Sequence, residues 1–230
     1  MSQTAEAPTI AVAPAPHLGT TAQSTRRMMI DVLLGLLPVV AMALFVFRQY
    51  AAKQLVICVV ACLVFEWAFT KWRGRTATLT DGSAAVTGVI LALSLPWSAP
   101  WYTGVIAAGI AIGIGKVMFG GLGQNIFNPA MVGRAFVMIC FPASLGAAAY
   151  VASGTGLDVL SQATPLTAAK QSGLSPALLD LVIGTTNGSL GETSAIACLL
   201  GGLYLCIRRS ASWEIPAACV VSVGAISTEA

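Results

Sequence analysis

The sequence predicts an all-α protein, a polytopic membrane helical bundle, and two observations favour this fold class. Of the 230 residues, 57% are hydrophobic and only 9% are charged, whereas soluble domains carry roughly 25% charged residues. Apolar runs also recur along the chain at lengths near the roughly 20 residues that a spanning helix needs. So little charge cannot cover a surface that faces water, and a lipid bilayer is therefore the expected surroundings.

The first segment, residues 1–25, is predicted to be a disordered cytoplasmic tail. It contains Pro8, Pro14 and Pro16 among many Ala and Thr residues, and it has no long apolar run. Such a composition buries too little apolar surface to offset the entropy lost on ordering. A secretory signal peptide is not predicted, because the segment lacks the positive charge and the apolar stretch that directly follows it in such peptides.

Residues 26–230 are predicted to form one transmembrane domain. Its expected spans are residues 28–47, 54–70, 83–95, 101–119, 130–150 and 192–207, with a seventh that begins near Trp213. Because that seventh apolar run stops at Ala230, the domain is expected to be truncated. The third span runs into Pro96 and the fifth contains Pro142, and non-helical backbone is tolerated at membrane depth only where protein or a cavity shelters it. Both are therefore expected to be broken helices inside the bundle.

The distribution of Lys and Arg predicts the orientation, since these residues gather on the cytoplasmic side of membrane proteins. With a cytoplasmic N-terminus and one crossing per span, most of them fall on the inner side: Arg26, Arg27, Lys71, Arg73, Arg75, Lys116, Arg134, Arg208 and Arg209. Arg48, Lys53 and Lys170 fall outside. The bacterial inner membrane is the expected location, with the long connection at residues 151–191 on the periplasmic side. A connection of this length in a compact bundle is usually functional or disordered.

Several kinds of chemistry are not indicated. The one histidine, His17, lies in the tail, so the chain offers no Ser-His-Asp triad. It has neither a P-loop nor a dinucleotide-binding glycine motif. The six cysteines form no CxxC pair, so no metal site is predicted. The basic residues form no dense run, so no nucleic-acid partner is predicted.

Acidic residues in or beside the spans are candidates for an ion path, because ionisable groups are costly within a membrane. They are Asp31, Glu66 and Glu192. Asp31 and Glu192 stand near span ends, where interfacial water or a helix N-terminus is a sufficient explanation for a charge. Glu66 stands one turn from the inner boundary and is expected to pair with Lys71 or Arg73.

A glycine-rich stretch, residues 113–123, leads to Asn128-Pro129 and Arg134. Its simpler interpretation is a helix end and a turn between two spans. Its sharper interpretation is a close approach of the backbone to a planar ligand or to another half-helix. Arg134 is expected to hold a polar or anionic ligand, or to satisfy carbonyl groups at a helix break. Asp81-Gly82-Ser83 is expected to cap the third span.

Four segments, in this order, resemble the family shared by the RnfD and NqrB membrane subunits. These subunits belong to the Rnf complex and to the Na+-translocating NADH:quinone reductase. The segments are LALSLPWSAPWY (residues 91–102), FGGLGQNIFNPAMVGRAFVMICFP (119–142), SQATPL (161–166) and NGSLGETSAIACLLGG (187–202). SQATPL resembles the flavin-attachment motif of that family, with Gln162 where glycine is frequent.

The resemblance implies that Thr164 carries FMN through a phosphoester bond to its hydroxyl group. Ser161 is then a local hydrogen-bond partner, and Pro165 restricts Thr164 to an extended or turn backbone. A second, non-covalent flavin such as riboflavin is also implied among the helices, with Asn128 and Arg134 as candidate binding residues. The family further implies two inverted repeats of five spans.

The function implied by the resemblance is that of an electron-relaying membrane subunit within an ion-translocating complex of the ferredoxin/NAD type, coupled to Na+ or H+ movement and not catalytic alone. Its implied partners are other membrane and peripheral subunits, including a second flavin-carrying subunit on the outer side and an iron–sulfur-carrying membrane subunit. A subunit of the NqrB type is the near alternative, which the short N-terminal tail disfavours. A solute channel or transporter is the alternative of another class, and it would not need the SQATPL loop.

Overall fold

A computed structural model describes residues 24–74, 79–145, 182–184, 188–192 and 194–228. Within these ranges the secondary structure is helical, apart from one isolated bridge between Pro96 and Ser189. The elements are α1 (Thr25–Phe47), α2 (Gln49–Trp72), the short 3-10 helix η1 (Leu79–Asp81), α3 (Ser83–Ser94), α4 (Trp101–Ile112), the π-helical turn η2 (Gly113–Val117), α5 (Pro129–Cys140), α6 (Pro142–Leu145), α9 (Ala195–Ile207) and α10 (Glu214–Thr228). The predicted all-α bundle is confirmed.

Two helices, α1 and α2, are long and apolar enough to cross a membrane, with 23 and 24 residues. The other apolar helices of the described chain are shorter, between 10 and 17 residues. The fifth predicted span, residues 130–150, is broken as expected, since α5 ends at Cys140. Pro142 has no amide hydrogen to continue the helical ladder and forces the residue before it out of the helical region. The chain restarts there as the single turn α6.

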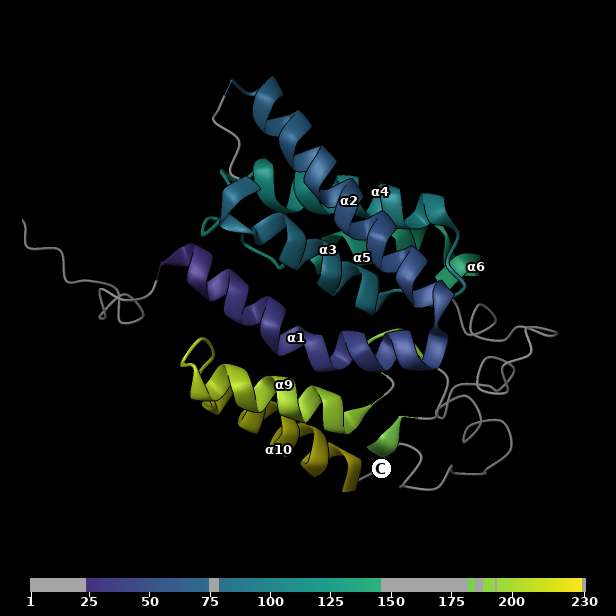
Figure 1. The fold of residues 1–230 in the computed structure, drawn as a ribbon, viewed down its shortest axis with the longest axis vertical. Coiled ribbons are helices and arrows are strands. Elements are labelled where there is room, and N and C mark those ends of the chain that lie inside the picture. Colours follow the sequence, from purple (N-terminus) through teal and green to yellow (C-terminus); the bar gives the residue numbers. More distant parts are fainter. Residues whose placement is uncertain (1–23, 75–78, 146–181, 185–187, 193, 229–230) are drawn as a thin grey trace, which may run out of the picture.

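In Figure 1, α1 runs between two groups of helices, with α2 to α5 on one side and α9 and α10 on the other. A single residue, Arg48, separates α1 from α2, and its φ angle of 48° turns the chain back sharply. The second helix therefore begins five residues earlier than the predicted start at residue 54.

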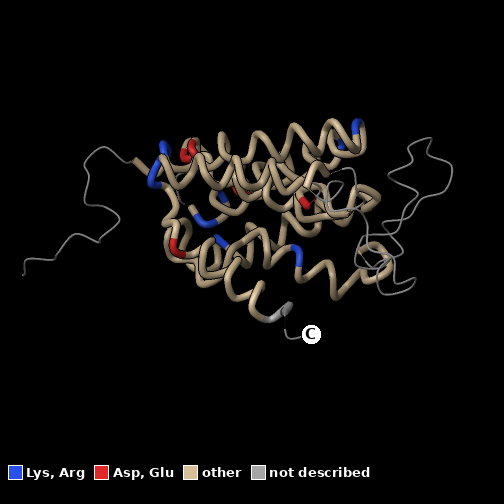
Figure 2. The backbone as a smooth tube through the Cα atoms, turned by 90° about the horizontal axis from the view of Figure 1, so that it is seen from below, with Lys and Arg blue, Asp and Glu red and all other residues tan. Residues whose placement is uncertain are grey.

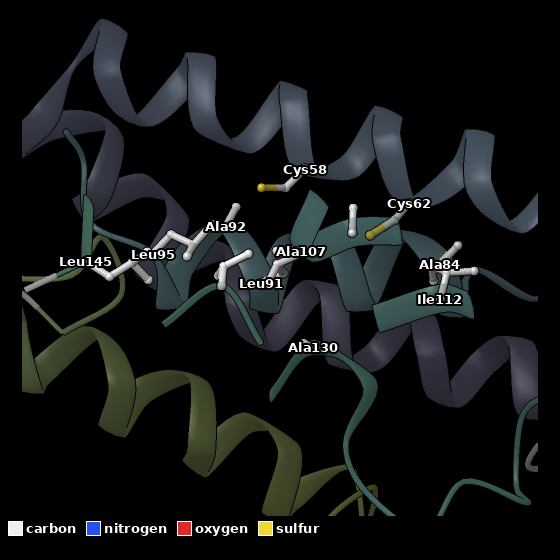
Figure 3. Close-up of a cluster of buried hydrophobic side chains, with 12 residues drawn as sticks. Cys58, Cys62, Ala84, Leu91, Ala92, Leu95, Ala107, Ile112, Ala130 and Leu145 are labelled. Carbon is white, nitrogen blue, oxygen red and sulfur yellow. The ribbon is translucent and has the colours of Figure 1, made fainter. Parts of the chain in front are cut away.

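The core of the first group is built from small side chains. In Figure 3, Cys58 and Cys62 point from α2 into a cluster that contains Ala92 of α3 and Ala107 of α4. Both thiols are fully buried. Small residues let helix backbones approach closely, which is the usual way in which membrane helices pack. Cys58 and Cys62 thus act as small apolar core residues, as buried free cysteines commonly do.

The predicted break at the end of the third span is confirmed, and it is sheltered. After α3 ends at Ser94, the residues from Leu95 to Trp97 stay buried. The amide of Gly191 donates to the carbonyl oxygen of Leu93 at 2.8 Å, and that of Leu190 donates to Leu95 at 3.3 Å. Backbone groups that lack helical partners are thus satisfied by a distant part of the chain, as membrane burial requires.

Charged residues are unevenly distributed over the described bundle. Figure 2 shows most of them near the end where α1 begins, and few near the opposite end. The sequence predicts such a gathering of Lys and Arg on one side of the membrane. That this side is the cytoplasmic one stays a prediction.

Candidate functional site

The site begins at the turn that leads into α3. Gly82 has a φ angle of 78°, a conformation that favours glycine. The turn brings Asp81 back onto the next residue but one: Asp81 Oδ1 accepts from the amide of Ser83 at 2.8 Å and from its hydroxyl group at 2.6 Å. The Asp81-Gly82-Ser83 segment leads into α3 as predicted, with Gly82 at the N-cap position. The Asp81 carboxylate fixes the Ser83 hydroxyl at the start of the helix.

Ser83 also accepts a hydrogen bond from a buried cation. Lys116, in the π-helical turn η2, donates from Nζ to Ser83 Oγ at 2.5 Å and to Glu66 Oε1 of α2 at 2.5 Å. The side chains of Lys116 and Glu66 are only 3% and 1% exposed. The expectation that Glu66 pairs with Lys71 or Arg73 was wrong. Lys71 lies over the ring of Trp67, 4.9 Å from its centre, and Arg73 donates to the carbonyl oxygen of Val117.

A cavity of about 390 Å³ lies beside this buried pair. Polar groups of Ser83, Lys116 and Asn125 contribute to its lining, together with apolar side chains such as Met29 and Phe127. Asn125 Oδ1 is buried and has no hydrogen-bond partner among the described residues. Apolar walls with a few converging polar groups are typical of small-molecule sites, so this cavity is the candidate binding site of the described chain.

Asn128 borders the cavity, but its Oδ1 atom accepts from the amide of Ala130 at 3.0 Å. It is therefore the N-cap of α5, followed by a proline at the first helical position, as is common. Arg134, one turn into α5, is not among the residues that line the cavity. Its Nε atom is buried and lacks a hydrogen-bond partner within the described ranges. One expected role for Arg134 was to donate hydrogen bonds to carbonyl groups at a helix break. Its Nε atom makes no such hydrogen bond to the described residues.

Asp31 lies in a second polar cluster, between α1 and α9. Its Oδ1 atom accepts from Arg208 Nη2 at 3.2 Å and from the hydroxyl group of Tyr204 at 3.4 Å. Ser210 donates to Oδ2 at 3.5 Å. The carboxylate is thus shared by three donors, and the described structure places it in a contact that fastens α9 to α1.

The remaining candidates lie apart from both clusters. Glu192 is exposed, directly after the segment that pairs with the end of α3. Thr164 and Ser161 lie outside the described residues. Sequence reasoning did not select Lys116, Ser83 or Asn125 as site residues. Lys116 had a usable signal, because a lone lysine inside an apolar helix demands a partner or a function.

Comparison with known proteins identifies a matching family and several related proteins. Residues 11–229 match the model of the NQR2, RnfD, RnfE family. The D subunit of the Na(+)-translocating ferredoxin:NAD(+) oxidoreductase complex of Acetobacterium woodii is 40% identical over 211 residues, which cover 90% of this chain and 65% of that protein. The D subunit of the proton-translocating ferredoxin:NAD(+) oxidoreductase complex of Clostridium ljungdahlii is 37% identical over 226 residues, 94% of this chain and 68% of that protein.

A third relative, the D subunit of the ion-translocating oxidoreductase complex of Stutzerimonas stutzeri, is 37% identical over 235 residues, 89% of this chain and 66% of that protein. The chain thus spans about two thirds of the length of these relatives. Because the family model matches nearly the whole chain and the identities exceed a third, this chain belongs to the NQR2, RnfD, RnfE family.

Proposed function

We propose that this protein is the D-type membrane subunit of an ion-translocating ferredoxin:NAD+ oxidoreductase complex, and that it relays electrons through an FMN bound covalently to Thr164. The observation that carries the proposal is family membership over residues 11–229, together with relatives whose names describe that complex. The motif SQATPL at residues 161–166 supports the covalent flavin.

The names of the relatives favour this complex over a quinone reductase of the NqrB type. The Acetobacterium and Clostridium proteins are named as subunits of ferredoxin:NAD(+) oxidoreductases, one Na+-translocating and one proton-translocating. Since the two differ in the named ion, the coupling ion does not follow from family membership, and both Na+ and H+ belong to the proposal.

Flavin bound at Thr164 would accept electrons from one partner and pass them to another. The residues of this chain would hold it in place. The Thr164 hydroxyl oxygen would form the phosphoester, so that the cofactor could not diffuse away on the outer side. Pro165 restricts the backbone of Thr164, and Ser161 would provide a nearby hydrogen bond.

A second, non-covalent flavin is also proposed, and the cavity beside Lys116 is where the described residues fit it best. The buried, unpartnered Asn125 Oδ1 atom offers an acceptor to a ring N–H donor. The apolar side chains of Met29 and Phe127 offer surfaces for a flat ring. Asn128 would act there mainly by capping α5, and Arg134, which does not line this cavity, is proposed only as a ligand contact elsewhere along α5.

The proposed partners are the other subunits of the complex, including a second flavin-carrying subunit on the outer side and an iron–sulfur-carrying membrane subunit. The proposed location is the bacterial inner membrane, with the N-terminus cytoplasmic and the Thr164 loop periplasmic. Glu66 is proposed as part of an ion path. Asp31 and Glu192 are weaker candidates, because Asp31 is already engaged by Arg208 and Glu192 is exposed.

In-gel flavin fluorescence of the denatured protein tests the proposal, with Thr164→Ala as the variant and Thr167→Ala as the matched control. The protein must be made in cells that contain the flavin transferase. We expect a fluorescent band for the parent chain and for Thr167→Ala, and a dark band for Thr164→Ala. Fluorescence that survives in Thr164→Ala would move the attachment to another residue. Absence of fluorescence from the parent chain would reject the covalent flavin and favour a solute channel or transporter.

A further inference from the structure

A continuous line of hydrogen bonds joins the turn before α3 to a carboxylate inside the bundle. Asp81 Oδ1 accepts from the Ser83 hydroxyl at 2.6 Å, Ser83 Oγ accepts from Lys116 Nζ at 2.5 Å, and Lys116 donates to Glu66 Oε1 at 2.5 Å. Asp81 is half-buried, whereas the other three residues are buried. The line therefore begins at a partly exposed group and ends at a buried one.

The inner end of this line lies well below the surface of the bundle. Glu66 precedes the end of α2 at Trp72 by about 9 Å along the helix, at 1.5 Å per residue. Burying an ion pair costs more desolvation than packing apolar residues of similar size. A charged pair at such a depth is therefore a weak device for stability and a frequent mark of function in membrane proteins. Lys116 lies in a π-helical turn, and such turns often occur at functional sites, which also supports a functional role for the pair.

We propose that Asp81, Ser83, Lys116 and Glu66 form a proton relay between the surface at η1 and the interior beside the cavity that Lys116 lines. This inference deepens the proposed function, on which it rests, because it supplies one route for the ion movement of the complex. It assigns roles to Asp81, Ser83 and Lys116 that family membership does not.

The transfer conserves both charge and atoms. Lys116 passes a proton to Glu66 Oε1, which breaks an N–H bond and forms an O–H bond, so that both groups become neutral. Protonated Asp81, loaded from water at the surface, then gives its proton to Ser83 Oγ as Ser83 gives its own proton to Lys116. The net change is one proton moved from Asp81 to Glu66, with Lys116 again an ammonium and Ser83 again a hydroxyl.

The same geometry argues against a metal-ion site at this place. A sodium ion would need the oxygens of Glu66 and Ser83 as ligands, whereas the Lys116 ammonium already donates to both. Among the described residues, titratable groups near the pair include Cys62, one turn before Glu66 on α2, and Arg73, which donates to the carbonyl oxygen of Val117. Neither stands between Asp81 and Glu66 in the hydrogen-bonded line.

The test uses the complete complex that contains this chain, reconstituted into liposomes and supplied with reduced ferredoxin and NAD+. Proton movement is followed with a pH-sensitive dye and divided by the number of electrons transferred. The variants are Ser83→Ala, which removes the relay hydroxyl, Ser83→Thr, which keeps one, and Lys116→Arg, which keeps the charge but does not release a proton. The matched control is Ser94→Ala, which removes another buried hydroxyl of α3, one bonded to the Leu91 carbonyl oxygen at 2.7 Å.

We expect Ser83→Ala and Lys116→Arg to lower the initial rate of proton movement by about tenfold or more, because positioned proton transfer typically contributes 10² to 10⁴ to a rate, and to lower the protons moved per electron with it. Ser83→Thr and Ser94→Ala should stay near the parent ratio. Asp81→Asn should lower the proton ratio as Ser83→Ala does. Because Asp81 is only half-buried, this variant is less prone to misfold than the variants of the buried residues. An unchanged ratio in Ser83→Ala or Lys116→Arg overturns the relay. The flavin band of Thr164, measured in the same samples, reports separately on the proposed function.

Discussion

Glu66 and Lys116 stabilise each other because neither charge has access to water. The desolvation cost of the pair is already incurred in the folded bundle, so the removal of one partner takes from the other charge the ion pair that offsets this cost. The two residues are fifty positions apart in the sequence, and η2 packs against α2 to bring them together.

Lys116→Met is expected to destabilise the protein by about 3 kcal/mol or more, the usual cost of breaking a buried ion pair. The double variant Lys116→Met with Glu66→Gln should recover much of that loss, since the remaining buried group is then neutral. Thermal unfolding of the detergent-solubilised protein measures both. Equal stability of the single variant and the parent would contradict the burial of this pair.

The N-cap of α5 gives a second prediction at the residue scale. Asn128→Ala should cost about 1 kcal/mol, because the amide of Ala130 loses its acceptor. Asn128→Asp should retain most of the stability, since its carboxylate accepts the same hydrogen bond. The unfolding midpoints of the two variants, measured side by side, check this expectation. An equal loss of stability in the two variants would show that the side-chain amide nitrogen of Asn128 contributes more than the hydrogen bond that its Oδ1 atom accepts.

At the scale of elements, close packing of glycines joins α1 to α9. A Cβ atom added at Gly201 would overlap the carbonyl oxygen of Gly35, and one added at Gly35 would meet Leu205 Cγ at 2.9 Å. The backbones of the two helices therefore touch, and the Asp31–Arg208 ion pair fastens them near the start of α1. Small residues at the crossing are what permit this approach.

Gly201→Ala is accordingly expected to destabilise the protein by about 1 to 3 kcal/mol, the typical cost of overpacking. Gly202→Ala is the matched control, because nothing lies within 4 Å of a Cβ atom at that position. Limited proteolysis and thermal unfolding in detergent should both separate the two variants. Identical behaviour of Gly201→Ala and Gly202→Ala would mean that α9 does not contact α1 through this face.

At the scale of the whole molecule, the chain is a multi-pass membrane protein whose charged residues gather near one end of the bundle. That asymmetry underlies the predicted orientation. Four cysteines are not fully buried and are replaced by alanine for a labelling experiment: Cys140, Cys198, Cys206 and Cys219. Cys58 and Cys62 are buried and can stay.

In that background, Ser24→Cys is expected to react with a membrane-impermeant maleimide only after the cells are permeabilised. Gln171→Cys, in the predicted outer connection, is expected to react in intact cells. Labelling followed by gel electrophoresis checks both positions in one experiment. The reverse pattern would place the N-terminus and α1's first turn on the outer side and invert the proposed topology.

The sequence predicted those features of the structure that depend on residues close together in the chain. The apolar runs predicted α1, α3, α9 and the combined stretch of α4 and η2 within three residues at each end. Pro96 predicted the break after α3, because helix formation and proline exclusion act between near neighbours. The helix start at Asp81-Gly82-Ser83 followed from the same local chemistry. Pro142 likewise predicted the break in the fifth span, where α5 ends at Cys140 and α6 follows as a single turn.

The candidate site was predicted only in part. Glu66 was selected because ionisable groups are costly within a membrane, and Asn128 and Arg134 because they follow the glycine-rich stretch. The sequence did not predict which groups these side chains contact. Glu66 pairs with Lys116 rather than with its near neighbours Lys71 and Arg73, since those two project from the exposed end of α2. Thr164 and Ser161 lie outside the described residues, and their roles stay predictions.

The sequence by itself determined that the chain is helical, that a membrane surrounds it, and that it belongs to its family. Each of these follows from composition, local periodicity or the order of motifs, which the chain carries without reference to its folded shape. Only the tertiary structure decided which charges meet: Lys116 with Glu66 and Ser83, and Arg208 with Asp31. Pairing across fifty or more residues depends on how helices cross, and helix crossing is set by side-chain packing between segments rather than by the sequence of any one of them.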